Sequence, residues 1–272
     1  MTALARPSVP SPVVVSKGGK LVVRRGDRER ELADSDGYSD YGPQLTPDGR
    51  FAVCGYGGGE FVRVWDAVTG EKKHDLVPEL SASGGGSTRS SPNVSCAPDG
   101  RHVAVHEFNR TVPENKPTWH VSVWDVASGK RVRKLIAPGA TTGTYLHWSG
   151  DSRTLLVTGW ADNAWARGFV AVCDPFSQEP PRMLAMDHGP GAVALSTDGK
   201  SFAVAVGSSI EFWDIGGAAL RYTLRTPPFG VTAMAFTPDG KQFITDGPDG
   251  TFLYPLPDLR RPPVAPLPRL IR

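Results

Sequence analysis

Apolar and polar residues alternate along most of this chain in short runs bounded by glycine and proline. Residues 50–54 and 201–205 are largely apolar at both sets of alternate positions, a pattern typical of strands that lie between two packed sheets. Residues 71–76 and 130–135 are mostly polar and predict solvated outer strands. The longest stretch without glycine or proline, residues 101–112, begins with strand-like alternation. We therefore expect an all-β fold with almost no α-helix.

A tight turn recurs five times between these strands. Proline presets φ in such a turn, aspartate bonds its own backbone, and glycine takes the left-handed conformation that ends it. The turns are residues 46–50, 97–101, 149–153, 196–200 and 237–241, and four of them contain the pairs Asp48-Gly49, Asp99-Gly100, Asp198-Gly199 and Asp239-Gly240. Aligned at positions 47, 98, 150, 197 and 238, they are 51, 52, 47 and 41 residues apart. Four-stranded propeller blades repeat every ~40–45 residues, so each unit is predicted to be a blade, some with insertions.

Each turn has a downstream partner of aliphatic, aromatic and aspartate residues. The partners are Val64-Trp65-Asp66, Val123-Trp124-Asp125, Val172-Cys173-Asp174, Phe212-Trp213-Asp214 and the degenerate Leu253-Tyr254-Pro255. A second turn closed by glycine follows at residues 67–70 and 126–129. Together the two motifs resemble those of WD-repeat β-propellers, over roughly residues 40–257. The resemblance implies four-stranded antiparallel blades, and it gives the repeated aspartates, glycines and tryptophans a structural role.

The repeats depart from the strict WD pattern in several places. The family links a Gly-His, a Ser or Thr, an Asp and the Trp in one hydrogen-bond network, and here His188 is the single candidate for the histidine. Cys173 replaces one tryptophan, and Tyr254-Pro255 replaces a Trp-Asp pair. These divergent units are similar to the bacterial style of the family.

The ends of the chain bear on the number of blades. Residues 13–32 predict three strands, with the turn at 17–20 in the register of the other turns. We expect six blades, in which this segment and the tail 262–272 share the last sheet and leave no unpaired edge. Five or seven blades remain alternatives. The predicted domains are a disordered N-terminus over 1–11, a propeller over 12–261 and a proline-rich tail over 262–272.

Composition narrows the function classes. Net charge is +2, with acidic and basic residues interspersed, so no basic stripe suits nucleic acid. No apolar run has the length of a signal peptide core or a membrane span, and we expect a cytoplasmic protein without membrane contact. Three cysteines, Cys54, Cys96 and Cys173, lie in apolar segments and are predicted to be buried, reduced thiols.

The loops suggest where a partner binds. In a WD-like blade the turns joining strands one to two and three to four share one face, and here they are short and uniform. The opposite loops, residues 81–91, 107–118 and 160–168, hold most of the length variation, and loops on a rigid scaffold usually carry binding. Aromatic residues and arginine are enriched at interface hot spots. The predicted partner-binding residues are Phe108, Arg110, Trp119, Trp160, Trp165 and Arg167, although the tryptophans could instead fold back over apolar edges.

Three chemical signals are weaker than their structural alternatives. His102, His106 and His120 could suggest zinc, but no cysteine or carboxylate has ligand-like spacing beside them. Residues 34–40 begin like a calcium loop, but Leu45 stands where the bidentate glutamate is needed. The tail 260–266 has the spacing of a polyproline ligand, but proline-rich ends are common as plain disordered termini, which is the favoured interpretation. No metal or cofactor site is predicted.

The sequence therefore predicts a non-catalytic platform for protein-protein interaction. Its partner would be another protein or another domain of a longer polypeptide, and the chain itself is expected to be a monomer. Bacterial proteins with similar repeats are often joined to signalling modules, which the resemblance implies. The alternative is a lactonase-like propeller hydrolase with a metal in its central funnel, which would need carboxylates or histidines from the inner strands. Those strands, such as residues 193–195 and 233–236, are nearly all apolar.

Overall fold

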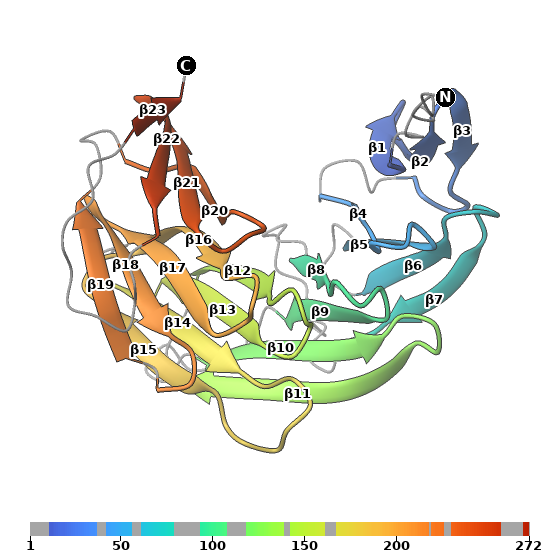
Figure 1. Ribbon diagram of the computed structural model, residues 1–272. Coiled ribbons are helices and arrows are strands. Elements are labelled where there is room, and N and C mark those ends of the chain that lie inside the picture. The colour runs from blue at the N-terminus through green and yellow to red at the C-terminus, as the bar shows by residue number, and fades with distance from the viewer. Residues whose placement is uncertain are drawn as a thin grey trace, which may run out of the picture. The chain divides into compact units, whose positions relative to one another are not determined.

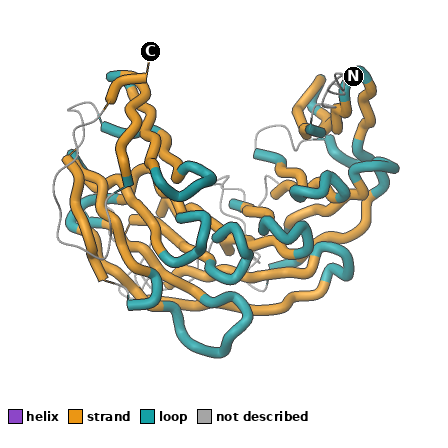
Figure 2. Tube along the Cα trace, viewed as in Figure 1, coloured by secondary structure: helices purple, strands orange, loops and turns teal. Residues whose placement is uncertain are grey.

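The computed structural model describes ten stretches of the chain. They are residues 11–36, 42–55, 61–78, 93–107, 118–138, 142–160, 167–217, 219–225, 230–256 and 269–271. The chain divides into two compact units, one formed by residues 1–108 and 124–131, the other by residues 109–123 and 132–272. The described parts consist of strands and turns, with no helix among them (Figures 1 and 2). The prediction of an all-β chain is confirmed.

The first unit contains two complete sheets and part of a third. Sheet A has three strands: β1 (Val13–Lys17), β2 (Lys20–Arg25) and β3 (Arg28–Glu31). Sheet B has four strands: β4 (Gln44–Leu45), β5 (Phe51–Gly55), β6 (Val62–Asp66) and β7 (Lys72–Leu76). Sheet C also has four, of which β8 (Val94–Cys96) and β9 (His102–Glu107) lie in this unit: the others are β10 (Thr118–Asp125) and β11 (Lys130–Pro138). The unit boundary crosses β10 and β11.

The second unit contains three more four-stranded sheets. Sheet D consists of β12 (Thr142–Trp148), β13 (Leu155–Trp160), β14 (Gly168–Cys173) and β15 (Arg182–Met186). Sheet E consists of β16 (Pro190–Leu195), β17 (Ser201–Val206), β18 (Ser209–Asp214) and β19 (Ala219–Arg225). Sheet F consists of β20 (Ala233–Phe236), β21 (Gln242–Gly247), β22 (Gly250–Pro255) and β23 (Arg269–Ile271). Six antiparallel sheets of three or four strands, each a meander in sequence order, are consistent with a β-propeller.

Burial follows the position of a strand within its sheet. The second strands β5 and β17 are buried along nearly their whole length, as their doubly apolar pattern predicts. In contrast, all four residues of β3 are exposed and charged. Charged residues on an outer strand discourage pairing with another chain. The buried second strands and the solvated outer strand expected from the sequence are therefore present.

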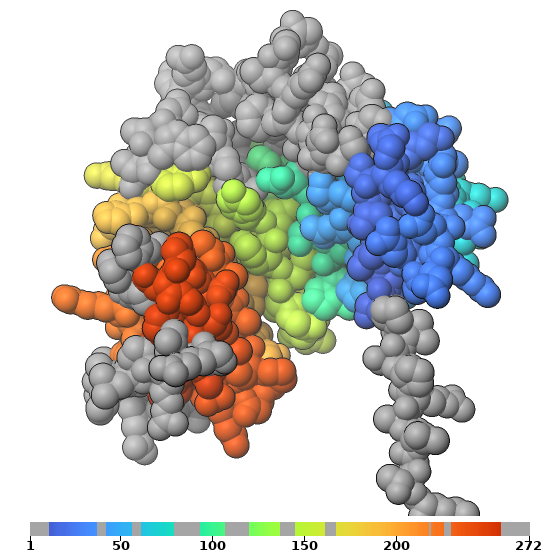
Figure 3. Space-filling model, turned by 90° about the horizontal axis from the view of Figure 1, so that it is seen from above, coloured from blue at the N-terminus to red at the C-terminus, as the bar shows by residue number. Residues whose placement is uncertain are grey.

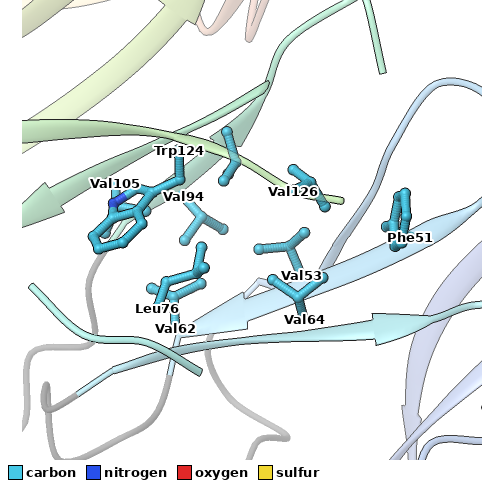
Figure 4. Close-up of a cluster of buried hydrophobic side chains, with 10 residues drawn as sticks. Phe51, Val53, Val62, Val64, Leu76, Val94, Val105, Trp124 and Val126 are labelled. Atoms are coloured by element: carbon cyan, nitrogen blue, oxygen red, sulfur yellow. The ribbon is translucent and has the colours of Figure 1, made fainter. Parts of the chain in front are cut away.

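The hydrophobic core lies between consecutive sheets. In the first unit one cluster joins Val53, Val64 and Leu76 of sheet B to Val105 and Trp124 of sheet C (Figure 4). Other clusters join sheets A and B, sheets D and E, and sheets E and F. Because sheets B and E each have a partner on both faces, their central strands need apolar residues at successive positions rather than at alternate ones.

The Asp-Gly turns repeat one hydrogen-bond pattern. In the first, the Thr46 hydroxyl donates to Asp48 Oδ1 over 2.6 Å and accepts from the Phe51 amide over 3.0 Å. The Arg50 amide also donates to Asp48 Oδ1, over 3.0 Å. Gly49 ends the turn with φ 67°. Ser149-Asp151, Ser196-Asp198 and Thr237-Asp239 repeat the hydroxyl-carboxylate bond at 2.6 Å.

Two turns vary this pattern for identifiable reasons. Ala97 has no hydroxyl, so Asp99 bonds the amides of Arg101 and His102, and its Oδ2 lies 2.6 Å from His102 Nδ1. In the third turn Ser152 takes the place of glycine and has φ 60°. The backbone shape is therefore retained although one sequence signal in each turn is lost.

The N-terminal sheet corrects one sequence prediction. Glu31 of β3 lies against Gly70 in the turn between β6 and β7, just as His74 of β7 lies against Gly129 in the turn between β10 and β11. Strand β3 therefore has the outer position, and β1 to β3 correspond to strands two to four of the other sheets. The turn at 17–20 joins the second and third strands of its sheet, not the first and second.

The tail corrects a second prediction. Residues 269–271 form β23, which pairs with β22, and β1 to β3 pair only with one another among the described strands. The N-terminal segment and the tail thus contribute to two different sheets instead of sharing one. The tail does supply a strand, while residues 1–10 and 262–268 lie outside the described part of the chain.

Cys54, Cys96 and Cys173 form no disulfide, and burial raises the pKa of each thiol to about 12. Cys54 and Cys173 are buried, whereas Cys96 is half-buried.

Within the described stretches, no helix has the length and hydrophobicity needed to cross a bilayer.

We expect Gly240→Ala to lower the free energy of unfolding by about 1 kcal/mol, because an L-residue with a side chain is strained in the left-handed region. A Cβ at Gly240 would meet only Thr197 Oγ1, at 3.8 Å, so the backbone conformation rather than a clash would set the cost. Gly240→Asn should cost less, because asparagine tolerates this conformation. Urea unfolding checks both variants, and equal stability of Gly240→Ala and wild type would contradict the prediction.

His147 predicts a pH dependence of stability. Burial lowers its pKa to about 4, below the value near 6.5 expected in an unfolded chain. Between about pH 6.5 and pH 4 the unfolded chain therefore binds a proton that the folded chain does not, so the free energy of unfolding falls as pH falls. We expect a loss on the order of 1–2 kcal/mol from pH 7 to pH 5.

Denaturant unfolding at several pH values measures this slope. His147→Gln should flatten it, and His188→Gln, at an exposed histidine, serves as the matched control and should leave it unchanged. An unaltered slope in His147→Gln would assign the effect to other groups.

Candidate interaction surface

The two repeated motifs meet at one edge of each sheet. The backbone carbonyl of the residue after the Asp-Gly pair accepts a hydrogen bond from the backbone amide of the residue after the Trp-Asp pair, or after Tyr254-Pro255 in the fifth repeat. The bonds are Ala67 N to Arg50 O (2.8 Å), Val126 N to Arg101 O (2.9 Å), Ile215 N to Lys200 O (2.8 Å) and Leu256 N to Lys241 O (2.8 Å). In the third repeat the corresponding residue is Pro175, which has no amide hydrogen to donate. The short turns therefore share one edge, as the sequence predicted.

The aspartates of the triplets close the second turn. Asp66 Oδ1 accepts from the amides of Val68 and Thr69, each over 2.9 Å. Asp125 accepts from the Ser128 amide and hydroxyl, and also from Arg101 Nε over 2.7 Å. The Arg101 hydrogen bond, followed by the Ser128 bonds, lowers the pKa of Asp125 to about 2 despite partial burial. These carboxylates are committed to turn structure and stay ionised at neutral pH.

The aromatic positions of the triplets belong to the core or its margin. Trp65 is fully buried, and its Nε1 donates to the Ala33 carbonyl over 2.6 Å. Trp124 is buried, and Trp213 stacks on Phe202 with ring centroids 6.2 Å apart. The replacements Cys173 and Tyr254 are buried as well. At these positions the motif contributes buried or stacked side chains to the packing between sheets.

Neighbouring turns pack against one another along the same edge. An added Cβ at Gly100 would lie 3.3 Å from Asp48 Cγ, and one at Gly199 would lie 3.4 Å from Asp151 Oδ2. Each glycine thus faces the aspartate of the preceding turn at close range. Its small size matters for packing between sheets as well as for φ.

Outer strands reach the next sheet at this edge too. His74 Nε2 lies 2.9 Å from the Ala127 carbonyl, and Arg133 Nη2 donates to the Glu179 carbonyl over 3.1 Å. Arg182 donates to the carbonyls of Ile215 and Gly216. In each case a side chain of the fourth strand binds the second turn of the following sheet. This edge is therefore extensively hydrogen-bonded and uniform.

The predicted partner-binding residues belong to the opposite loops. Phe108, Arg110 and Trp165 lie outside the described residues, and Trp119 is described only as part of strand β10. Arg167 is exposed immediately before β14, and Trp160 is half-buried at the end of β13. Trp160 of β13 pairs with Gly168 of β14. Arg167 therefore lies next to the residue that pairs with Trp160.

Trp160 folds back onto the link between sheets D and E. Its ring lies so close to Gly189 that an added Cβ there would overlap Cζ3 and Cη2. Gly168, on the other strand of this hairpin, lies against Pro190. A Cβ added at Gly168 would lie 2.8 Å from the His188 carbonyl oxygen. The sequence left open that the tryptophans fold back onto the protein. Trp160 does so, because its ring lies against Gly189.

Residues 188–190 lie at the centre of this edge. They are not among the partner-binding residues predicted from the sequence. Gly207, in the turn between β17 and β18, has φ 56°, and its added Cβ would lie 2.8 Å from His188 Cδ2. The ends of the β13–β14 hairpin, the β17–β18 turn and the link between sheets D and E therefore meet around His188 and Gly189. The sequence signal for this base is the His188-Gly189 pair just before a strand. The repeat pattern relates His188 only to the WD network.

The candidate metal ligands have other contacts. His102 Nδ1 lies 2.6 Å from Asp99 Oδ2, and the His106 amide donates to the Asn93 carbonyl. In the acidic segment, the Asp34 carbonyl accepts from Arg63 Nη1 and the Ser35 hydroxyl accepts from the Leu21 amide. Over the described ranges, no group of three or more His, Cys, Asp or Glu residues is placed to hold a metal ion.

Comparisons with known proteins support the fold. No protein-family model matches the chain, and no curated protein matches it in sequence. Hydrazine synthase from Kuenenia stuttgartiensis is similar in structure, with a TM-score of 0.63, 15% identity, and coverage of 90% of this chain and 80% of that chain. A chain of the mitotic checkpoint complex is similar with a TM-score of 0.67, 17% identity, and coverage of 95% of this chain and 73% of that chain.

These likenesses define the class of fold. At such low identities they show a β-propeller-like architecture, in agreement with the six antiparallel sheets. The function of this chain does not follow from them.

Substitution at Gly189 tests the support beneath the variable loops. We expect Gly189→Ala to lower the free energy of unfolding by about 1–3 kcal/mol, because the added methyl group overlaps the Trp160 ring. Gly191→Ala, two residues later in β16, is the matched control, since its Cβ would lie 3.4 Å from Ala205 Cβ, close to ordinary contact.

A double-mutant cycle with Trp160→Ala isolates this contact. The cost of Gly189→Ala should shrink in the Trp160→Ala background, as measured by denaturant unfolding. An equal cost in both backgrounds would show that the two residues do not interact.

Proposed function

We propose that this protein is a divergent WD-repeat scaffold that binds another protein, or another domain of a longer polypeptide, through the edge carrying the long loops. The observation that carries the proposal is the contrast between the two edges. One edge has short turns that repeat the same hydrogen bonds from sheet to sheet. The other joins loops of unequal length to a tightly packed base.

The base consists of Trp160, Gly168, His188, Gly189 and Gly207. Close contacts at these glycines hold the ends of the β13–β14 hairpin and the link between sheets D and E. Binding loops need such a support, because ordering a loop on association costs conformational free energy. Arg167 is exposed beside this base, and Trp165 is two residues away in sequence. These two residues are the proposed contacts nearest to a defined support.

The inner strands favour a binding scaffold over the lactonase-like alternative. Exposed residues on β12, β16 and β20 include Tyr145, Gly191, Ala233 and Ala235. None of these four side chains is a carboxylate or an imidazole, the groups that a lactonase-like metal site requires. The aspartates of the repeats bond backbone amides in turns.

The fold comparisons support the same proposal without specifying a partner. One similar chain belongs to a mitotic checkpoint complex, so a fold of this kind occurs within a protein assembly. A cytoplasmic location and a signalling role for this chain remain predictions from the sequence.

Paired variants test the proposed surface. Wild type, Trp165→Ala/Arg167→Ala and the opposite-edge control Lys200→Ala/Lys241→Ala are used to capture partners from lysate of the source cells, with quantitative mass spectrometry. We expect at least about a tenfold loss of the principal partner for the loop variant, the scale of a ~1.4 kcal/mol hot-spot loss. The control should bind like wild type.

Equal capture by all three proteins would contradict the assignment of this patch. Metal analysis and a lactone and ester hydrolysis panel on the same preparation test the enzymatic alternative. A stoichiometric metal together with turnover would overturn the scaffold function.

A further inference from the structure

Strand β11 is the outer edge of sheet C. The strands of this sheet follow the order β11-β10-β9-β8, so β11 lies on the outer side of β10 and pairs with no other described strand (Figure 1). With 9 residues it is the longest of the described strands. An edge strand leaves a row of backbone N–H and C=O groups to which another strand can bind. Its side chains decide whether such pairing is blocked or favoured.

One face of β11 is held by contacts within the protein. Arg131 lies over the Trp124 ring, with its guanidinium carbon 5.8 Å from the ring centroid. Arg133 Nη2 donates to the Glu179 carbonyl over 3.1 Å, and Leu135 is buried. Successive side chains of a strand point to opposite faces, so these three residues share one face and the residues between them share the other.

The other face of β11 reads Lys-Val-Lys-Ile. It consists of Lys130, Val132, Lys134 and Ile136, of which Lys134 is half-buried and the others are exposed. Val132 is 44% exposed and Ile136 is 50% exposed. Aliphatic and basic side chains therefore alternate along the outer edge of the sheet, where a further strand would contact them.

The other fourth strands with described side chains lack this combination. Sheet A also lies at the surface of its unit, where it appears in blue in Figure 3, but its outer strand β3 alternates arginine with glutamate. Strand β7 contains Asp75, which forms ion pairs with Arg63 and Lys72. Strands β15 and β19 each expose one large apolar residue, Met183 and Leu220. In contrast, β11 combines two exposed aliphatic residues with four basic residues and no acidic residue.

A second copy of the chain is a poor partner for this edge. If two copies of β11 paired antiparallel with Val132 opposite Ile136, Lys134 of one copy would lie opposite Lys134 of the other. Like charges directly opposite each other destabilise a strand pair. The remaining charged residues of β11 are basic as well, so the charge of this strand favours an acidic partner.

We propose that the outer edge of β11 binds an extended acidic segment of a partner protein, which adds to sheet C as a fifth strand. On the Lys-Val-Lys-Ile face, this segment has aliphatic residues opposite Val132 and Ile136 and a carboxylate opposite Lys134. Strand addition of this kind derives affinity from main-chain hydrogen bonds and specificity from alternate side chains. The surface is separate from the loop edge of the proposed function, and the inference does not rest on that function.

A fluorescently labelled synthetic peptide tests the proposal by its anisotropy with the full chain. In this acidic peptide, threonine alternates with glutamate, valine, glutamate, isoleucine and glutamate, so that one face matches the Lys-Val-Lys-Ile face of β11. A basic peptide has lysine in place of each glutamate. We expect the acidic peptide to bind wild type at least about tenfold more tightly than the basic peptide, because opposite charges across a strand pair attract and like charges repel.

Charge reversal in the protein should reverse this preference. Lys130→Glu/Lys134→Glu should bind the basic peptide more tightly than the acidic one. The control Lys200→Glu/Lys241→Glu makes the same change in net charge at exposed turns of other sheets and should keep the preference of wild type. Equal effects of the two double variants would overturn the proposal, because net charge rather than β11 would then govern binding. Denaturant unfolding checks that both variants fold.

Hydrogen exchange of the wild-type chain locates the peptide without any substitution. The acidic peptide should slow exchange of backbone amides within residues 130–136, because strand addition gives the outer-edge amides hydrogen-bond partners. Binding without this protection, or no binding of the acidic peptide by wild type, would refute strand addition at β11. A dimer of the free chain that the acidic peptide dissociates, seen by light scattering, would assign the edge to a second copy and overturn the choice of partner.

Discussion

One backbone hydrogen bond, made in four of the five repeats, links the two repeated motifs and organises the short-turn edge of these sheets. It joins the carbonyl after the Asp-Gly pair to the amide after the Trp-Asp pair, as in Ala67 N to Arg50 O at 2.8 Å. This bond connects the turn between strands one and two to the turn between strands three and four. It therefore sets the strands of a sheet in one register and brings all short turns to one edge. The bond survives in the fifth repeat, where the aspartate is lost, because it uses only backbone atoms.

Packing between sheets depends on that common edge. Once the turns lie in the same place in every sheet, Gly100 can face Asp48 and Gly199 can face Asp151 at about van der Waals distance. Side chains of fourth strands, such as His74 and Arg133, then reach carbonyls of the next sheet. The short turns are constrained from several directions, so length variation is confined to the opposite loops. There a smaller set of contacts, centred on Trp160 and Gly189, supports the proposed binding residues.

Local signals predicted most of the fold because each acts within a few residues. The Asp-Gly turns, the doubly apolar second strands and the polar outer strands all appear where the pattern places them. The position of the N-terminal strands within their sheet was harder to predict. The turn at 17–20 resembles in composition the turns that join the first and second strands of the other sheets. Its true position follows from the contact between Glu31 and Gly70, which are far apart in sequence. The candidate surface was predicted only in outline for the same reason, since the base around His188 unites loops from two sheets.

The sequence by itself determined the class of fold, the repeat boundaries and the edge that would be uniform. It did so because proline, aspartate and glycine determine the turn conformation at their own positions. The pattern of apolar and polar residues along a strand likewise indicates which of its faces are buried. Only the tertiary structure decided which strands the two ends of the chain join, and that Trp160 rests on Gly189. Such pairings depend on distances between segments remote in sequence, and many partners with similar propensity compete for them. The tail strand illustrates this most clearly, since its composition allows a strand but only the register with β22 assigns it an edge.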